Sequence, residues 1–264
     1  MLRPRDLAPA ITRLRGASLL TFDRLGDEQL AVEALPGWTV ADVFRHLADS
    51  DRGSVLGGHL LEFLPGKDLD AFEDHNDANL ERLRLRDRAT LRRELEVWGR
   101  RLARVVGLVP TSMARVTVPT AFGRLPMGWL AGLRLYDEWV HQWDVARALG
   151  EDDEPPMDVP LQGLLAEFQL RALPAGSLGD VPQDGVVEVD VAHGPRWRFD
   201  LGRHRFGANV GATPTATVRL DVAAFQLVAA DRVPWRDLAA SSRLELDDDD
   251  QGSGAALLDA CRVV

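Results

Sequence analysis

Residues 134–150 read "RLYDEWVHQWDVARALG", and this stretch decides how the first half of the chain is expected to fold. Its composition is helical and it ends on a glycine, which predicts the last turns and the C-terminal cap of a long helix. Asp137 and His141 are four residues apart, so both lie on one face of that helix. Trp139 and Trp143 flank the pair and indicate that it is not freely solvated. The pair is therefore a solvated face, part of a buried ion-pair network, or half of a metal site.

Four amphipathic segments predict a helical bundle in the first 150 residues. Apolar residues recur in them at the three-to-four spacing of a helix with one buried face. The second segment begins with Thr39 and Asp42, a spacing typical of a capping box, and the fourth ends at Gly150. Long helices with connections of mixed length indicate a four-helix bundle. The segments are residues 6–25, 37–64, 86–109 and 127–150.

The periodicity changes in the remainder of the chain. Residues 150–160 are acidic and proline-rich, which predicts a linker, and a further helix is expected near residues 161–173. Two strands are expected within residues 185–201, joined by a turn at residues 193–195, and another within residues 215–222. Two more helices are expected, over residues 223–233 and 253–264.

The predicted fold class is α and α+β in two domains. We expect a four-helix bundle over residues 1–150 and a linker with a connecting helix over residues 151–180. A smaller α+β domain follows over residues 181–264.

Composition excludes several classes of protein. The formal net charge of -10 argues against general binding of nucleic acids, whose phosphates require clustered cations. Cys261 is the single cysteine, so no disulfide and no cysteine-based metal site can form within one chain. No apolar stretch approaches the roughly 20 residues of a membrane span, and the N-terminal residues lack the apolar core of a signal peptide. We therefore expect a cytoplasmic protein, whose oligomeric state the sequence leaves open.

A third polar side chain lies in the second predicted helix. His46 stands at the edge of the apolar stripe of that helix, which places its imidazole in or beside the core. A lone histidine in such a position is most often a core residue bonded to a carbonyl. If the second and fourth helices are neighbours, however, His46, Asp137 and His141 supply two nitrogens and one oxygen with open positions, the pattern of a catalytic metal site. Zinc, nickel, iron and manganese all accept this set.

Other polar residues near this set have alternative roles. Glu138 is three residues before His141 and could replace Asp137 as the acidic ligand, although we favour Asp137. Asp144 could orient a metal ligand or pair with Arg147, and we favour the second. No nucleotide-binding loop and no nucleophile motif is present. The remaining histidines are interpreted as surface or structural residues: His59, His75, His193 and His204.

Three stretches carry a resemblance to a known family. Residues 37–51, "GWTVADVFRHLADSD", resemble the second-helix motif of the DinB-like bundle superfamily, in particular of the branch named for mycothiol-dependent maleylpyruvate isomerase. Residues 125–150 resemble the fourth helix of that branch, in which an acid and a histidine are four residues apart. Residues 216–246 are similar to the small sterol-carrier-like α+β domain that follows the bundle in these proteins.

The resemblance implies a ligand set and a co-substrate. In the family a metal, usually zinc, is held at the positions of His46, Asp137 and His141, and the best-known member has glutamate in place of Asp137. Mycothiol is the implied thiol co-substrate. The family also uses a basic residue from its second domain in catalysis. The candidates here are Arg196, Arg198, Arg203, Arg205, Arg219 and Arg243.

The implied function is that of a metal-dependent enzyme that uses mycothiol to isomerise a small electrophilic acid or to transfer sulfur to it. A bound divalent metal lowers the pKa of a thiol, and the resulting thiolate can add to an electrophilic carbon. An arginine from the second domain could clamp a carboxylate of the substrate. Two alternatives remain open. One is a metal-dependent hydrolase that uses bound water, and the other is a non-catalytic protein that binds or senses a small molecule.

Overall fold

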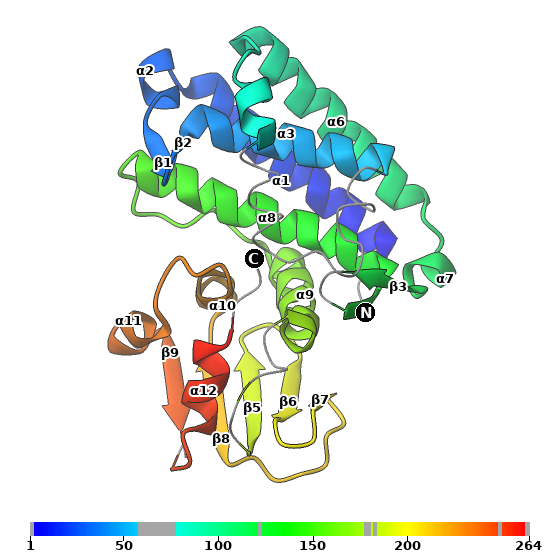
Figure 1. The fold of residues 1–264 in the computed structure, drawn as a ribbon, viewed down its shortest axis with the longest axis vertical. Coiled ribbons are helices and arrows are strands. Elements are labelled where there is room, and N and C mark those ends of the chain that lie inside the picture. The colour runs from blue at the N-terminus through cyan, green and yellow to red at the C-terminus, as the bar shows by residue number, and fades with distance from the viewer. Residues whose placement is uncertain are drawn as a thin grey trace. The chain divides into compact units, whose positions relative to one another are not determined.

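The computed structural model describes residues 3–57, 78–120, 123–176, 181, 184–247 and 250–261. The chain divides into two compact units, residues 2–156 and residues 157–264, and each is described by itself (Figure 1). The first unit is helical and the second combines helices with a sheet, which confirms the predicted fold class. The domain limits at residues 150 and 180 stay predictions. Within the described ranges, no helix combines the length and apolar character that a membrane span requires.

Long helices form the framework of the first unit, as the amphipathic segments predict. Its elements in chain order are α1 (Pro4–Arg24), α2 (Asp27–Leu30), β1 (Glu33–Leu35), β2 (Trp38–Thr39), α3 (Val40–Leu56), α6 (Arg88–Leu108), α7 (Thr111–Ala114), β3 (Thr117–Thr120), β4 (Gly123–Pro126) and α8 (Met127–Ala148). Helices α1 and α3 each contact both α6 and α8. Two antiparallel hairpins, β1–β2 and β3–β4, precede α3 and α8 respectively.

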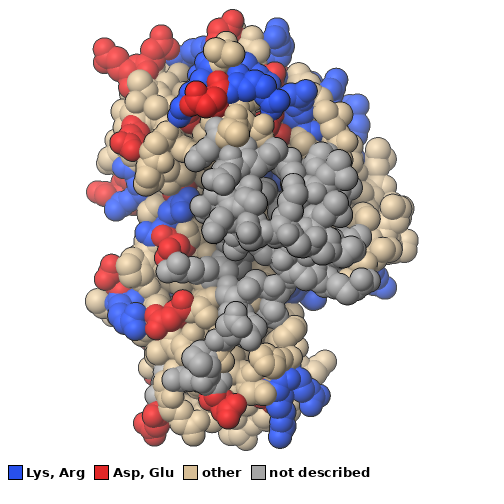
Figure 2. All heavy atoms as spheres, viewed as in Figure 1, with Lys and Arg blue, Asp and Glu red and all other residues tan. Residues whose placement is uncertain are grey.

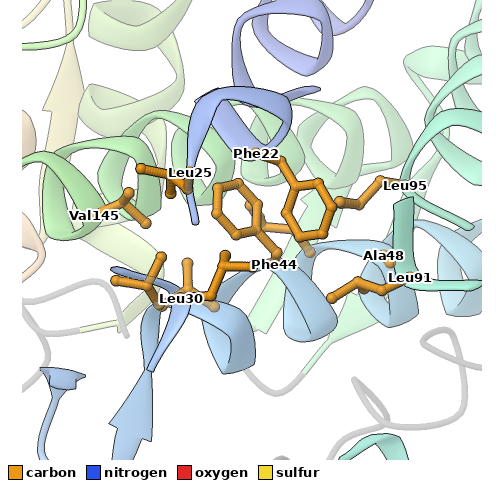
Figure 3. Close-up of a cluster of buried hydrophobic side chains, with 11 residues drawn as sticks. Phe22, Leu25, Leu30, Phe44, Ala48, Leu91, Leu95 and Val145 are labelled. Atoms are coloured by element: carbon orange, nitrogen blue, oxygen red, sulfur yellow. The ribbon is translucent and has the colours of Figure 1, made fainter. Parts of the chain in front are cut away.

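A buried aromatic pair joins the helices of the bundle. Phe22 of α1 meets Phe44 of α3 edge to face, with ring centroids 5.1 Å apart. Leu91 and Leu95 of α6 and Val145 of α8 complete the cluster around them (Figure 3). Full burial of a side chain of this size contributes about 1.5–3 kcal/mol, so this cluster holds all four helices together.

The capping box predicted at Thr39 and Asp42 is present and sets where α3 begins. The backbone N–H of Asp42 donates to Oγ1 of Thr39 at 3.2 Å, and the backbone N–H of Thr39 donates to Oδ2 of Asp42 at 3.0 Å. Burial acts to raise the pKa of Asp42, but the bonds from Arg84 and Thr39 outweigh it and lower that pKa. A defined first turn also fixes which face of α3 carries His46.

Gly150 closes α8, as its sequence predicts. The residue has φ +74°, in the left-handed region that favours glycine. Its N–H donates to the carbonyl of Arg147 at 3.0 Å, and the N–H of Glu151 donates to the carbonyl of Ala146 at 2.9 Å. These bonds satisfy carbonyls of the last turn. The helix therefore ends here, and the acidic segment follows.

Charged side chains of α6 lie on the surface of the first unit. Arg92 donates to Asp23 of α1 at 3.1 Å and also pairs with Glu96 one turn along its own helix. Basic and acidic side chains of this kind stand next to one another over the helices in Figure 2. The pattern agrees with the polar face of an amphipathic helix, as expected for residues 86–109.

The second unit contains one sheet with helices. Its elements in chain order are α9 (Val159–Gly176), β5 (Val186–Val191), β6 (Arg196–Asp200), β7 (Arg205–Gly207), β8 (Ala216–Leu220), α10 (Val222–Ala229), α11 (Trp235–Ala240), β9 (Leu244–Asp247) and α12 (Ser253–Asp259). The strand order is β7-β6-β5-β8-β9, with β5 and β8 parallel and the other neighbours antiparallel. Helix α9, expected in a connecting segment, packs on α10 of this unit.

Local signals identified most but not all of the sheet. Strands β5 and β6 and the turn between them lie where the sequence predicts, and His193 in that turn has φ +59°. Strands β7 and β9 are not among the expected strands. Both are short and partly exposed, and β9, although its apolar and polar residues alternate, has only four residues. After α12, Cys261 is 2% exposed, and burial raises the pKa of its thiol to about 12.

Candidate metal centre

Helices α3 and α8 bring the three predicted side chains together. His46 comes from α3, and Asp137 and His141 come from adjacent turns of α8. One ligand atom from each of the three lies within 4.8 Å of the other two. The Nε2 of His46 is 3.5 Å from Oδ2 of Asp137, and the Nε2 of His141 is 3.6 Å from Oδ1. The two helices are therefore neighbours, which spacing in the sequence could not establish.

The donor set fits a divalent metal. Each imidazole has a carboxylate oxygen of Asp137 at 3.5 or 3.6 Å, and one ligand atom from each of the three residues lies within 4.8 Å of the other two, close enough for all three to bind one metal at bonds of about 2.1 Å. Two imidazole nitrogens and one carboxylate leave a further position for an exogenous ligand, as in catalytic metal sites. No other group of three or more histidine, cysteine or acidic side chains has this spacing within the described part of the chain.

The protonation states also suit metal binding. His46 and His141 are each 8% exposed. Burial lowers the pKa of His46, against the attraction of Asp137, so its imidazole is neutral at neutral pH and has a lone pair available. Burial acts to raise the pKa of Asp137, but Arg134, His46 and His141 outweigh it and hold that pKa well below its ordinary value. The site thus offers neutral imidazole and an anionic carboxylate, the forms that metals bind.

Asp144 orients His141. Its Oδ2 lies 2.9 Å from Nδ1 of His141, one turn along α8. A carboxylate at Nδ1 holds the proton on that nitrogen and leaves Nε2 as the acceptor that faces Asp137. Arg147, the alternative partner of Asp144, forms an ion pair with Asp152 at 3.1 Å. The contact between Asp144 and His141 therefore assigns Asp144 to the orienting role, which was the less favoured of the two interpretations from the sequence.

Trp38 lies against both imidazoles. Its ring centroid is 5.2 Å from that of His46 and 6.3 Å from that of His141, with the second pair stacked. The residue belongs to β2, one position before the capping residue Thr39. The β1–β2 hairpin therefore places the indole ring of Trp38 beside the imidazoles of His46 and His141.

A buried ion-pair network adjoins Asp137, and it is not among the sequence-based expectations. Arg134 donates to Oδ2 of Asp137 at 2.5 Å and contacts Oδ1 of Asp51 in α3 at 3.3 Å. Arg15 of α1 contacts Oδ2 of Asp51 and Oε2 of Glu138, both at 2.7 Å. The four residues beyond Asp137 have side chains no more than 9% exposed.

Glu138 takes no part in the three-residue cluster. Its carboxylate accepts from Ser18 of α1 as well as from Arg15. Gln142 donates to the hydroxyl of Ser18 at 2.9 Å and to the carbonyl of Leu14 at 2.8 Å. The face of α8 that carries Glu138 is thus directed toward α1, whereas the face with Asp137 is directed toward α3.

A cavity of about 240 Å³ has His141 in its wall. Its polar lining includes Ser18 and Gln142, and its acidic rim comes from the segment after α8, with Glu151 and Asp153. The first unit therefore has room for part of a small molecule beside one of the two histidines.

The other residues considered from the sequence lie elsewhere. His59 and His75 are outside the described residues. His193 and His204 have positive φ angles and belong to turns of the second unit. Several of the candidate arginines form ion pairs within their own unit: Arg196 with Asp190, Arg198 with Glu188, Arg219 with Asp247 and Arg243 with Asp221.

Comparison with known proteins identifies similar sequences and folds. A family model described as "Mycothiol maleylpyruvate isomerase N-terminal domain" matches residues 12–146. The crystal structure of the mycothiol-dependent maleylpyruvate isomerase is 15% identical, with a TM-score of 0.52, and the match covers 93% of each chain. A histidine-to-alanine mutant of that isomerase matches over the same share of each chain, at 15% identity and with a TM-score of 0.51.

The second unit has a weaker match. The structure of Sterol Carrier Protein 2 Like 2 from Aedes aegypti is 21% identical over 36% of this chain and 91% of its own, with a TM-score of 0.28. No protein among the curated sequences matches the chain.

Proposed function

Because the chain belongs to the mycothiol maleylpyruvate isomerase family, whose N-terminal domain spans residues 12–146, we propose that it is a metal-dependent enzyme that uses a low-molecular-weight thiol. The metal ligands in this proposal are His46, Asp137 and His141. The single observation that carries it is the convergence of these three side chains from two helices, within 4.8 Å of one another. We propose zinc as the metal and mycothiol as the thiol.

A divalent metal bound there would lower the pKa of the thiol, so that thiolate is present at neutral pH. The chain's own residues prepare the site for this role. Asp144 keeps Nε2 of His141 turned toward Asp137, and the pKa of His46 is low enough for the neutral form. Trp38 covers the two imidazoles and limits the access of water to them.

The reaction in this proposal is addition of the thiolate to an electrophilic carbon of a small unsaturated acid. Addition forms a C–S bond and moves the electron pair of the C=C bond into the substrate as an enolate. Rotation about the resulting single bond and elimination of the thiolate would give the geometric isomer, whereas protonation of the enolate by water and release of the adduct would make the protein an S-transferase. Both routes need the same thiol and the same open metal position. A reduced thiol pool exists in the cytoplasm, and we propose that the protein works there.

Metal content is the first test of the proposal. Elemental analysis of the purified, untagged protein is expected to give about one metal per chain, as for a site with one ligand set. The His46→Ala/His141→Ala double variant is expected to lose that metal and to retain its helical circular dichroism. A matched control is His193→Ala/His204→Ala, which removes two histidines outside the cluster and is expected to retain the metal. Absence of metal from the wild type, even after reconstitution, would contradict the proposal and favour a binding protein.

Thiol dependence is the second test. Turnover of small electrophilic unsaturated acids is expected with mycothiol present and not when it is omitted. Turnover of a substrate by the metal-loaded protein without any thiol would favour the alternative of a hydrolase, because the same donor set can hold a nucleophilic water.

A further inference from the structure

Arg134 links the acidic member of the cluster to a carboxylate on another helix. One terminal nitrogen of its guanidinium donates to Oδ2 of Asp137 at 2.5 Å. The other terminal nitrogen and Nε contact Oδ1 of Asp51 in α3, at 3.3 and 3.4 Å. Its side chain is 9% exposed, so both contacts lie away from bulk water. Arg134 thus holds two carboxylates from two helices at once.

The linkage continues to α1 and returns to α8. The second oxygen of Asp51 accepts from Arg15 at 2.7 Å, and the same nitrogen of Arg15 lies 2.7 Å from Oε2 of Glu138. Charges therefore alternate in sign along the series Asp137, Arg134, Asp51, Arg15 and Glu138. Asp51, the carboxylate in the middle of the series, is held by arginines on two sides, so the position of Arg134 is set by α1 as well as by α3.

A contribution to stability does not by itself explain why these charged side chains are buried. Removing charged groups from water costs several kcal/mol per ion, and replacing a buried ion pair by apolar side chains is often neutral or stabilising. Asp137 is the one member of the series that also faces the two imidazoles. We propose that Arg134 is a positioning residue that holds Asp137 toward His46 and His141, with Asp51 and Arg15 as its supports. This inference rests on the proposed metal site.

The shape of arginine is suited to this role. The planar guanidinium presents its donors in a fixed fork and can contact two carboxylates in one geometry, whereas the ammonium of lysine is a flexible point charge. A lysine at this position would keep the positive charge and lose the simultaneous contacts to Asp51 and Asp137.

The direction of the effect separates positioning from simple electrostatics. A positive charge beside a metal site repels the incoming cation, so a purely electrostatic role predicts that loss of Arg134 tightens metal binding. A positioning role predicts weaker binding, because Asp137 is no longer held in one orientation. Arg134→Lys leaves the charge in place and changes the geometry, and it therefore reports on positioning.

The experiment compares the affinities of the wild type and of Arg134→Lys for Zn²⁺ and Co²⁺. Arg134→Lys is expected to bind each metal about 10–100-fold more weakly, the usual effect of losing a residue that orients a ligand. The visible spectrum of bound Co²⁺ is expected to change in band position or intensity, because it reports on ligand geometry. Arg147→Lys is the matched control, since Arg147 is on the same helix and pairs with Asp152 at the surface. Its metal affinity and Co²⁺ spectrum are expected to equal those of the wild type.

A second variant provides a test in case Arg134→Lys does not fold. Asp51→Asn keeps the size of the side chain and weakens the hold on Arg134 without touching Asp137. It is expected to bind Co²⁺ more weakly than the wild type and to change the Co²⁺ spectrum. If Arg134→Lys fails to show helical circular dichroism, the spectrum of Asp51→Asn decides the question, because loss of a nearby negative charge would by itself weaken the binding of a cation without changing the ligand geometry.

Two outcomes would overturn the inference, and they can be told apart. In the first outcome the wild type binds metal, and a folded Arg134→Lys binds it equally well or more tightly. If Arg134→Lys is unfolded, the comparison is made with Asp51→Asn, and an unchanged Co²⁺ spectrum is this outcome. This outcome would refute the positioning role and leave the proposed function standing. No metal binding in the wild type would refute both.

Discussion

The bundle buries an alternating series of arginines and carboxylates between α1, α3 and α8, whereas the second unit places comparable ion pairs at its surface. The side chains of Arg15 and Glu138 are 5% and 6% exposed. Those of Arg236 and Asp259, which join α11 to α12, are 64% and 53% exposed. Buried charges are costly and exposed pairs contribute little, so the first arrangement points to a function, whereas the second is a solvated ion pair that adds little to stability.

The largest effect is expected when the buried series is broken. Arg15→Met removes the cation between Asp51 and Glu138 and is expected to lower the free energy of unfolding by about 3–5 kcal/mol, because a buried carboxylate loses its partner. Denaturant unfolding monitored by circular dichroism measures it. The Arg15→Met/Glu138→Gln double variant is expected to recover part of the loss. If Arg15→Met lowers the free energy of unfolding by less than about 1 kcal/mol, the buried pair of Arg15 and Glu138 contributes no more than a surface pair. The contrast between the two units would then be lost.

A smaller effect is expected at the helix contact that encloses Arg15. A Cβ at Gly99 of α6 would lie 2.6 Å from Cγ and 2.9 Å from Nε of Arg15, so the side chain of Arg15 would have to move. Gly99→Ala is expected to lower the free energy of unfolding by about 1–3 kcal/mol through overpacking.

Gly16→Ala is the control for Gly99→Ala. Gly16 is also helical, but an added Cβ there meets no atom within 4 Å. This variant is expected to raise the free energy of unfolding by about 0.5–1 kcal/mol, since alanine loses less conformational entropy in a helix. Equal effects of the two substitutions would show that α6 does not constrain Arg15.

The smallest effect is expected in the second unit. A double-mutant cycle of Arg236→Ala and Asp259→Ala is expected to give a coupling energy below about 1 kcal/mol, because both side chains are solvated. The coupling should decrease further as salt is added. A coupling as large as that of Arg15 with Glu138 would contradict the contrast between the two units.

Local information in the sequence is enough to predict the long helices of the bundle, but not the short helices α2, α7 and α11, and to predict two of the three proposed ligands as a pair. Asp137 and His141 are adjacent on one helix, so their proximity follows from spacing alone. The capping box at Thr39 and the left-handed Gly150 are also local signals. The packing of α3 against α8 depends on the tertiary fold, which local patterns do not reveal. Only the resemblance to a family indicated that His46 joins Asp137 and His141.

The buried network is not among the sequence-based expectations, because its members come from three different helices. A signal was present in α1, where Ile11, Arg15, Ser18 and Phe22 follow one another at helical spacing and are all buried. A charge within such a stripe indicates a partner in the core. The identity of that partner, Asp51, could not be read from the sequence, because the two residues are on different helices.

Cys261 has a consequence for the chemistry proposed here. Reactivity of cysteine toward electrophiles requires the thiolate, and burial raises the pKa of this thiol to about 12. It is also the single cysteine in the chain. With the proposed function, the protein would meet a reactive sulfur nucleophile and electrophilic acids and would offer no accessible thiolate of its own to be alkylated. It should survive many encounters with substrates that inactivate proteins with exposed cysteines.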